Sequence, residues 1–133
     1  KWTSNLFVSR ANVGGHTIVD GETEDTIAIE TLTLADIMEE NQIGKIDLLK
    51  LDCEWSEYEI LFSLDAETLT RISNIYMEVH YNETIAKKYR KYSMLDFLRE
   101  QGYHVRIIKE FYYEGEGEFY VLFAQRWTPH DAP

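Results

Sequence analysis

The chain has 133 residues, enough for one domain, and its composition is that of an ordinary globular protein with 44% hydrophobic and 28% charged residues. Its formal net charge of −11 argues against nucleic acid and anionic membrane surfaces as partners, because both attract an excess of Lys and Arg. The single cysteine, Cys53, excludes an internal disulfide and fits a reducing, cytoplasmic compartment. No run of residues is long and apolar enough to span a bilayer.

The first predicted elements are two strands and a short helix. The apolar run Asn5–Ser9 and the alternating, β-branched run Thr26–Leu32 are both predicted to be strands. Thr33 is typical of a helix N-cap, and its helix is expected to run to Glu40 and to exit at Gly44. These elements precede the most informative stretch of the sequence.

That stretch joins an apolar run to an amphipathic helix, with acidic residues at the junction. The apolar run Ile46–Cys53 predicts a buried strand. Ser56 and Glu59, three residues later, have the spacing of a capping box, which predicts that a helix begins there. Open α/β sheets bind ligands where a strand ends and a helix begins. The acids at this junction are Asp52, Glu54 and Glu57.

The second half of the chain continues the alternation of helices and strands. Asp65–Arg71 is predicted to be a short helical turn and Asn74–His80 a strand that ends in polar groups. Ser93 is predicted to cap a further helix, which Gly102 closes. Two final strands with a glycine-containing segment between them should form an antiparallel hairpin, and they are Tyr103–Lys109 and Glu118–Arg126. The pattern as a whole predicts a mixed α/β fold.

Two pairs of polar residues are spaced to meet at one sheet edge. Asp52 and Glu54 are two residues apart, as are Glu78 and His80, so each pair should share one face of its strand. If the two strands are parallel neighbours, the pairs converge. A carboxylate or imidazole there could act as general base for a substrate hydroxyl. Alternatively, these groups could hold a divalent metal such as Mg²⁺ or Mn²⁺.

The same residues also have a structural interpretation. Lys50 alternates to the same side as Asp52 and Glu54, and it can simply pair with one of them. An acid at a helix amino terminus, such as Glu57, is favoured by the helix dipole alone. Trp55 can fill space beside the turn as well as stack on a substrate or adenine ring. From the isolated pattern, both interpretations stay open.

A block of charged residues with fixed spacing carries a family resemblance: Lys50-x-Asp52-x-Glu54-x-x-Glu57, preceded by Ile46-Asp47-Leu48-Leu49. This block resembles the most characteristic block of the FkbM-type methyltransferases. Ile75–His80 resembles the family's next strand, which also carries an acid. The resemblance runs from about Thr26 to His80, and Trp55 stands where the family pattern has glycine.

The resemblance implies an S-adenosylmethionine-dependent enzyme, with O-methylation of a small molecule or a sugar as the expected reaction. It also implies an α/β fold that is the carboxyl-terminal half of a Rossmann-like class I methyltransferase sheet, ending in an antiparallel β-hairpin. Residues 1–133 would form this single domain, and the cofactor-binding amino-terminal half would be absent. The half-sheet would then pair with that missing half or with a second copy of the chain.

The resemblance further implies roles for seven residues. Those expected in catalysis are Asp52, Glu54, Glu78 and His80. The first two of these would also lie next to the cofactor, and Glu78 or His80 would serve as base or metal ligand. Those expected to contact the substrate are Lys50, Trp55 and Glu57.

Two other functions remain as alternatives. The chain would be a degenerate, non-catalytic domain that binds a partner, if Trp55 at the glycine position and the lack of a glycine-rich cofactor loop are decisive. It would be a metal-binding regulatory domain if the acid cluster holds a cation rather than a substrate.

Overall fold

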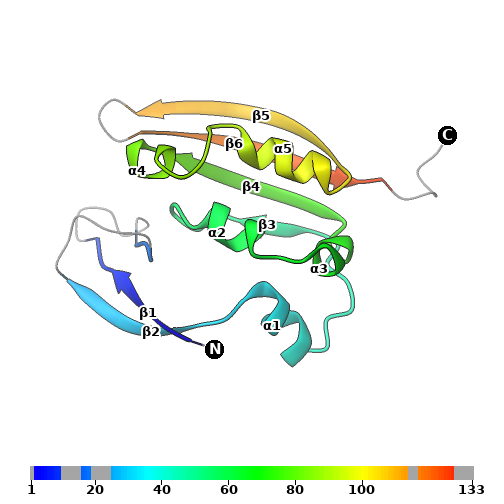
Figure 1. Cartoon of the computed structure of the whole chain (residues 1–133), viewed down its shortest axis with the longest axis horizontal. Coiled ribbons are helices and arrows are strands. Elements are labelled where there is room, and N and C mark those ends of the chain that lie inside the picture. Colours follow the sequence, from blue (N-terminus) through cyan, green and yellow to red (C-terminus); the bar gives the residue numbers. More distant parts are fainter. Residues whose placement is uncertain (1, 10–15, 19–24, 114–116, 128–133) are drawn as a thin grey trace.

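The computed structural model describes residues 2–9, 16–18, 25–113 and 117–127, and it has a mixed α/β structure with two separate sheets (Figure 1). The smaller sheet pairs β1 (Trp2–Phe7) and β2 (Thr26–Thr31) antiparallel. The larger sheet contains β3 (Leu49–Leu51), β4 (Asn74–Tyr81), β5 (Tyr103–Tyr113) and β6 (Gly117–Arg126). The helices are α1 (Leu34–Glu40), α2 (Glu57–Phe62), α3 (Ala66–Thr70), α4 (Glu83–Ala86) and α5 (Ser93–Glu100).

The larger sheet is mixed, with the strand order β3-β4-β6-β5. β3 runs parallel to β4, whereas β6 lies between β4 and β5 and is antiparallel to both. The pairing of the last two strands continues to Tyr113, beyond the predicted end at Lys109, because β6 offers partners along its whole length. The residues between them, 114–116, lie outside the described part of the chain.

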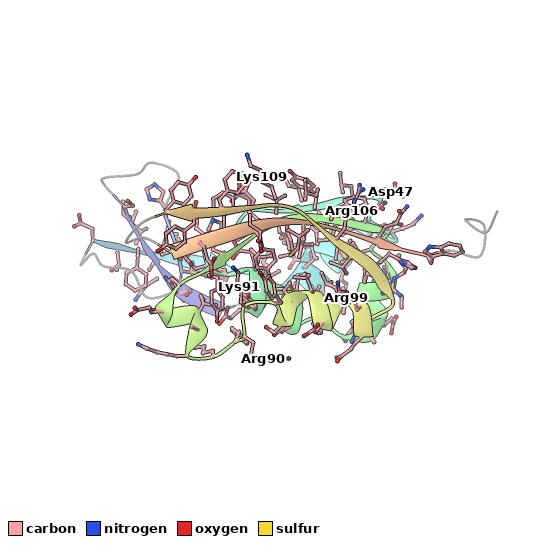
Figure 2. All side chains as sticks on the ribbon, turned by 90° about the horizontal axis from the view of Figure 1, so that it is seen from above. Asp47, Arg90, Lys91, Arg99, Arg106 and Lys109 are labelled. Carbon is pink, nitrogen blue, oxygen red and sulfur yellow. The ribbon has the colours of Figure 1, made fainter. Side chains whose placement is uncertain are left out.

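The helices cover one face of the larger sheet. Alternate residues of β4 and β6 point toward them and form the core with apolar side chains of α2, α3, α4 and α5. The core residues of these two strands are Ile75, Met77, Val79, Tyr120, Leu122 and Ala124. Figure 2 shows Arg106 and Lys109 on the opposite face, which no helix of the described residues covers. Both cations lie over aromatic rings there, those of Phe123 and Phe111.

The prediction of a buried strand over Ile46–Cys53 is wrong, because only Leu49–Leu51 forms the strand β3. Within the described residues β3 pairs on one side only, with β4, and the pairing covers Leu49–Leu51. Ile46 makes an isolated parallel bridge to Ile72, and Leu48 is 58% exposed. The apolar run is therefore an edge segment rather than a central strand.

The predicted helix ends are partly right: Asp65 and Arg71 flank α3, and Gly102, with a φ of +85°, follows the end of α5. Thr33 caps α1 as expected, but the helix exits through Gln42, whose φ is +54°, and not at Gly44. Ser56 makes no capping bond: its φ and ψ (−92° and 0°) are not those of an extended cap residue, and its buried hydroxyl has no hydrogen-bond partner among the described residues. Ser93 is the first residue of α5 rather than its cap, and its hydroxyl donates to the carbonyl of Arg90.

Candidate functional site

A sharp turn between β3 and α2 positions the acidic residues. The strand ends at Leu51, and Glu54 and Trp55 both adopt positive φ, +43° and +81°. Side chains other than glycine rarely adopt this left-handed conformation, and where they do, the surrounding structure imposes it. The expectation that Asp52 and Glu54 share a strand face is therefore wrong, because the turn and not the pleat brings them together.

The carboxylates of Asp52 and Glu54 meet the imidazole of His80 at the carboxyl ends of β3 and β4. One ligand atom of each of the three side chains lies within 4.8 Å of the other two. Nε2 of His80 is 3.8 Å from Oε2 of Glu54. The convergence follows from the parallel pairing of β3 with β4, which brings the two strand ends to the same edge. Nζ of Lys50 lies 3.2 Å from Oδ2 of Asp52 at the exposed rim of this group.

The second ring nitrogen of His80, Nδ1, contacts the buried carboxylate of Glu57. Oε1 of Glu57 lies 3.0 Å from Nδ1 of His80 and also accepts a hydrogen bond from the backbone N–H of Cys53 at 3.0 Å. Glu57 is 0% exposed, and its Oε2 is buried without a hydrogen-bond partner among the described residues. The Glu57 carboxylate therefore faces His80 and the turn rather than solvent.

Aromatic rings pack against the imidazole of His80. The ring centroids of Trp55 and Phe119 lie 5.2 and 5.4 Å from that of His80. Gly117 makes room for Trp55, because a Cβ at Gly117 would lie 3.5 Å from the indole and 2.9 Å from the carbonyl oxygen of Tyr81. As a result, the His80 side chain is only 10% exposed.

The charges of this group perturb one another. Burial alone would lower the pKa of His80, but the hydrogen bond and charge of Glu57, with the charges of Glu54 and Asp52, raise it above its ordinary value. Burial raises the pKa of Glu54, and the charge of His80 opposes that rise. Burial also raises the pKa of the Cys53 thiol. A buried imidazole between carboxylates is thus arranged to accept a proton.

Among the four predicted catalytic residues, Glu78 lies outside the group of Asp52, Glu54 and His80. It is half-buried and precedes His80 by two residues on β4, and its charge contributes to the raised pKa of Glu54. Two residues at the site were not predicted from the sequence: Thr17, whose hydroxyl donates to the backbone carbonyl of Glu54 at 2.7 Å, and Phe119, whose ring packs against His80. No local pattern could have identified either residue, because their contacts span 37 and 39 positions of the chain.

Together, the mixed sheet and the carboxylate–imidazole cluster at the ends of two parallel strands define an α/β domain with a candidate ligand site at its sheet edge. The chain belongs to the FkbM methyltransferase domain family, whose model matches residues 2–105, and this confirms the resemblance of the charged block. No helix in the described part of the chain has the length and apolarity needed to cross a membrane.

A curated protein also matches the chain. The AMB antimetabolite synthetase AmbE of Pseudomonas aeruginosa is 31% identical over 86 residues, which is 65% of this chain. The match covers 4% of that synthetase, so the chain corresponds to a small part of it. No solved structure matches the chain.

Proposed function

We propose that the chain is part of an S-adenosylmethionine-dependent methyltransferase with a Rossmann-like sheet, which methylates an oxygen of a small molecule or a sugar in the cytoplasm. The observation that carries the proposal is the convergence of Asp52, Glu54 and His80 at the carboxyl edge of parallel strands. Membership of the FkbM methyltransferase domain family supports it independently. The edge of β3 that has no partner among the described residues would pair with further strands of the same enzyme or with a second copy.

The charge of the site fits the cofactor. Asp52 and Glu54 offer two carboxylates, and the nearby cation Lys50 engages only Asp52, at the exposed rim. When bound, S-adenosylmethionine supplies an electrophilic methyl group on a positively charged sulfur. Asp52 and Glu54 would hold this positive charge, because opposite charges attract strongly where solvent is partly excluded.

The remaining side chains would handle the acceptor. Nε2 of His80 would take the proton of the acceptor hydroxyl, a role that contributes roughly 10²–10⁴-fold to a rate. Trp55 and Lys50 would contact the acceptor at the partly open rim, and Glu78 would add negative charge beside His80. Trp55 and Phe119 would limit the access of water to the imidazole.

The Asp52→Asn variant of the complete protein tests this proposal. Within the described residues the Asp52 side chain, which is partly exposed, pairs with Lys50 at the rim, so the variant should fold normally. We expect turnover, measured as formation of S-adenosylhomocysteine with hydroxylated acceptors, to be lost while the unfolding temperature is unchanged. Full activity of this variant would contradict the assignment. If the wild-type protein does not bind S-adenosylmethionine in calorimetric titration, a non-catalytic, partner-binding domain becomes the better explanation.

A second candidate is a divalent metal at the same residues. Two carboxylates and an imidazole with ligand atoms within 4.8 Å of one another form a donor set that suits Mn²⁺ or Mg²⁺. Treatment of the complete protein with a chelator tests this candidate. Activity that is lost and then restored by Mn²⁺ would support a metal, and activity that is unaffected would exclude it.

A further inference from the structure

Among the described residues the buried carboxylate of Glu57 has two hydrogen-bond partners, and together they indicate which groups donate and which accept. Burying a charged carboxylate is unfavourable unless hydrogen bonds compensate. Here a single oxygen, Oε1, meets both the backbone N–H of Cys53 and Nδ1 of His80, each at 3.0 Å. Because the N–H of Cys53 can only donate, Oε1 acts as an acceptor. The shared oxygen is therefore suited to accept from Nδ1 of His80 as well.

This contact determines which ring nitrogen carries the hydrogen. A neutral imidazole has one N–H and one nitrogen with a lone pair. If Nδ1 donates to Glu57, the lone pair belongs to Nε2, which points at the group formed with Asp52 and Glu54. Nε2 and Oε2 of Glu54 are 3.8 Å apart, which is longer than a hydrogen bond. The lone pair is therefore directed into the site and is not satisfied by Glu54.

The orientation of the ring is restricted by packing as well as by the hydrogen bond. Trp55 and Phe119 both contact the imidazole, with centroid distances of 5.2 and 5.4 Å. A half-turn of the ring would place Cδ2 where Nδ1 lies and would break the bond to Glu57. Nothing in this arrangement resembles ordinary helix capping, because the backbone N–H that Glu57 accepts belongs to Cys53, which precedes the helix α2.

We propose that Glu57 is a positioning residue that holds His80 as the Nδ1–H tautomer with the lone pair of Nε2 directed at the acceptor hydroxyl. This inference rests on the proposed function, in which His80 accepts the proton. The proton of the acceptor hydroxyl passes to Nε2, and the acceptor oxygen keeps the electron pair. The imidazolium that forms remains hydrogen-bonded to the Glu57 carboxylate, whose second oxygen has no other partner among the described residues.

The tautomer can be measured directly in the complete protein labelled with ¹⁵N-histidine. The His80 resonances are assigned by their loss in the His80→Asn variant. We expect the nitrogen shifts and proton couplings of the wild-type protein, recorded above the pKa of the ring, to identify Nδ1 as the protonated nitrogen. Protonation at Nε2 instead would overturn the proposal, whether or not the protein proves to be a methyltransferase.

Kinetics of three variants then separate positioning from a merely structural role. Glu57→Met fills the same space but removes the acceptor, so we expect kcat to fall about 100-fold, within the range of general-base effects, with KM for S-adenosylmethionine little changed. Glu57→Gln can place its amide oxygen at the position of Oε1, so it should retain the tautomer and recover much of kcat. Glu59→Gln is the matched control on the same helix, because Glu59 faces Lys88 and Tyr89, and its kcat should equal that of the wild type.

The outcomes of these experiments distinguish a failure of the positioning role of Glu57 from a failure of the proposed function. An unchanged kcat in Glu57→Met, or an equal loss in Glu57→Gln and Glu57→Met, would contradict positioning through the hydrogen bond. If Glu57→Met does not fold, the comparison of Glu57→Gln with the wild type by ¹⁵N resonances still decides whether an acceptor at this position is sufficient. Absence of turnover in the wild-type protein would count against the proposed function and leave the tautomer test standing.

Discussion

The starts of α1 and α2 look alike in the sequence but differ in the structure. At α1, Thr33 and Asp36 form a complete capping box, with side-chain to backbone distances of 2.9 and 3.0 Å. At α2, Ser56 makes no capping bond, and the first-turn acid Glu57 contacts His80 of the strand β4. The side chains at the start of α1 thus bond to the backbone of that helix, whereas Glu57 at the start of α2 contacts a residue of the candidate site. Local capping rules predict helix starts well only where no tertiary contact competes for the same side chains.

The largest difference between the two helix starts should appear when Glu57 is replaced. Glu57→Ala leaves a cavity and deprives Cys53 N–H and His80 of a buried acceptor. We expect the free energy of unfolding to fall by about 3 kcal/mol, because each unsatisfied buried donor costs about 1–3 kcal/mol. Urea denaturation of the complete protein measures this change. A loss of less than about 1 kcal/mol in the free energy of unfolding, the typical contribution of an N-cap, would show that the contact with His80 contributes little to stability.

The turn before α2 should also carry backbone strain that the start of α1 lacks. Trp55 has a φ of +81°, which favours glycine. We therefore expect Trp55→Gly to be more stable than Trp55→Ala by about 1 kcal/mol, because both lose the indole but only glycine tolerates the left-handed conformation. Thermal unfolding of the two variants makes the comparison. Equal stabilities would indicate that the turn relaxes when the indole is removed.

Replacement of the working cap should have a smaller effect. Thr33→Ala removes the side-chain acceptor for the N–H of Asp36 and half of the capping box. We expect a loss of about 1 kcal/mol in the free energy of unfolding, the typical value for an N-cap. The measurement is urea denaturation, and Thr33→Ser, which keeps the hydroxyl, is the control that should retain most of the stability.

The smallest effect is expected at the serine that does not cap. The hydroxyl of Ser56 is buried and has no hydrogen-bond partner among the described residues. Ser56→Ala should therefore leave the free energy of unfolding within about 0.5 kcal/mol of the wild type, or raise it slightly, because a desolvated and unpaired hydroxyl is removed. A loss as large as that of Thr33→Ala would show that Ser56 caps α2 in solution.

Much of the secondary structure could be predicted because its signals are local. Alternating and β-branched runs identified β2 and β4, and Thr33 identified the start of α1. Strand lengths could not be predicted in the same way. β3 pairs with β4 over three residues only, because the chain turns away at Glu54 and Trp55, whereas β5 reaches Tyr113 because β6 pairs with it that far. Pairing partners, and not composition, decided where each strand ended.

The local sequence identified the three side chains at the centre of the candidate site. Asp52, Glu54 and His80 follow or end apolar runs that form parallel neighbouring strands, so their meeting at one edge was predictable from their places at the strand ends, although not from their two-residue spacing. The geometry in which these side chains meet depends on tertiary contacts. The positive φ of Glu54, the burial of Glu57 beneath His80 and the arrival of Phe119 depend on strand register and on packing between distant segments. A linear pattern records none of these, because they arise only when the strands are aligned and the turn is closed.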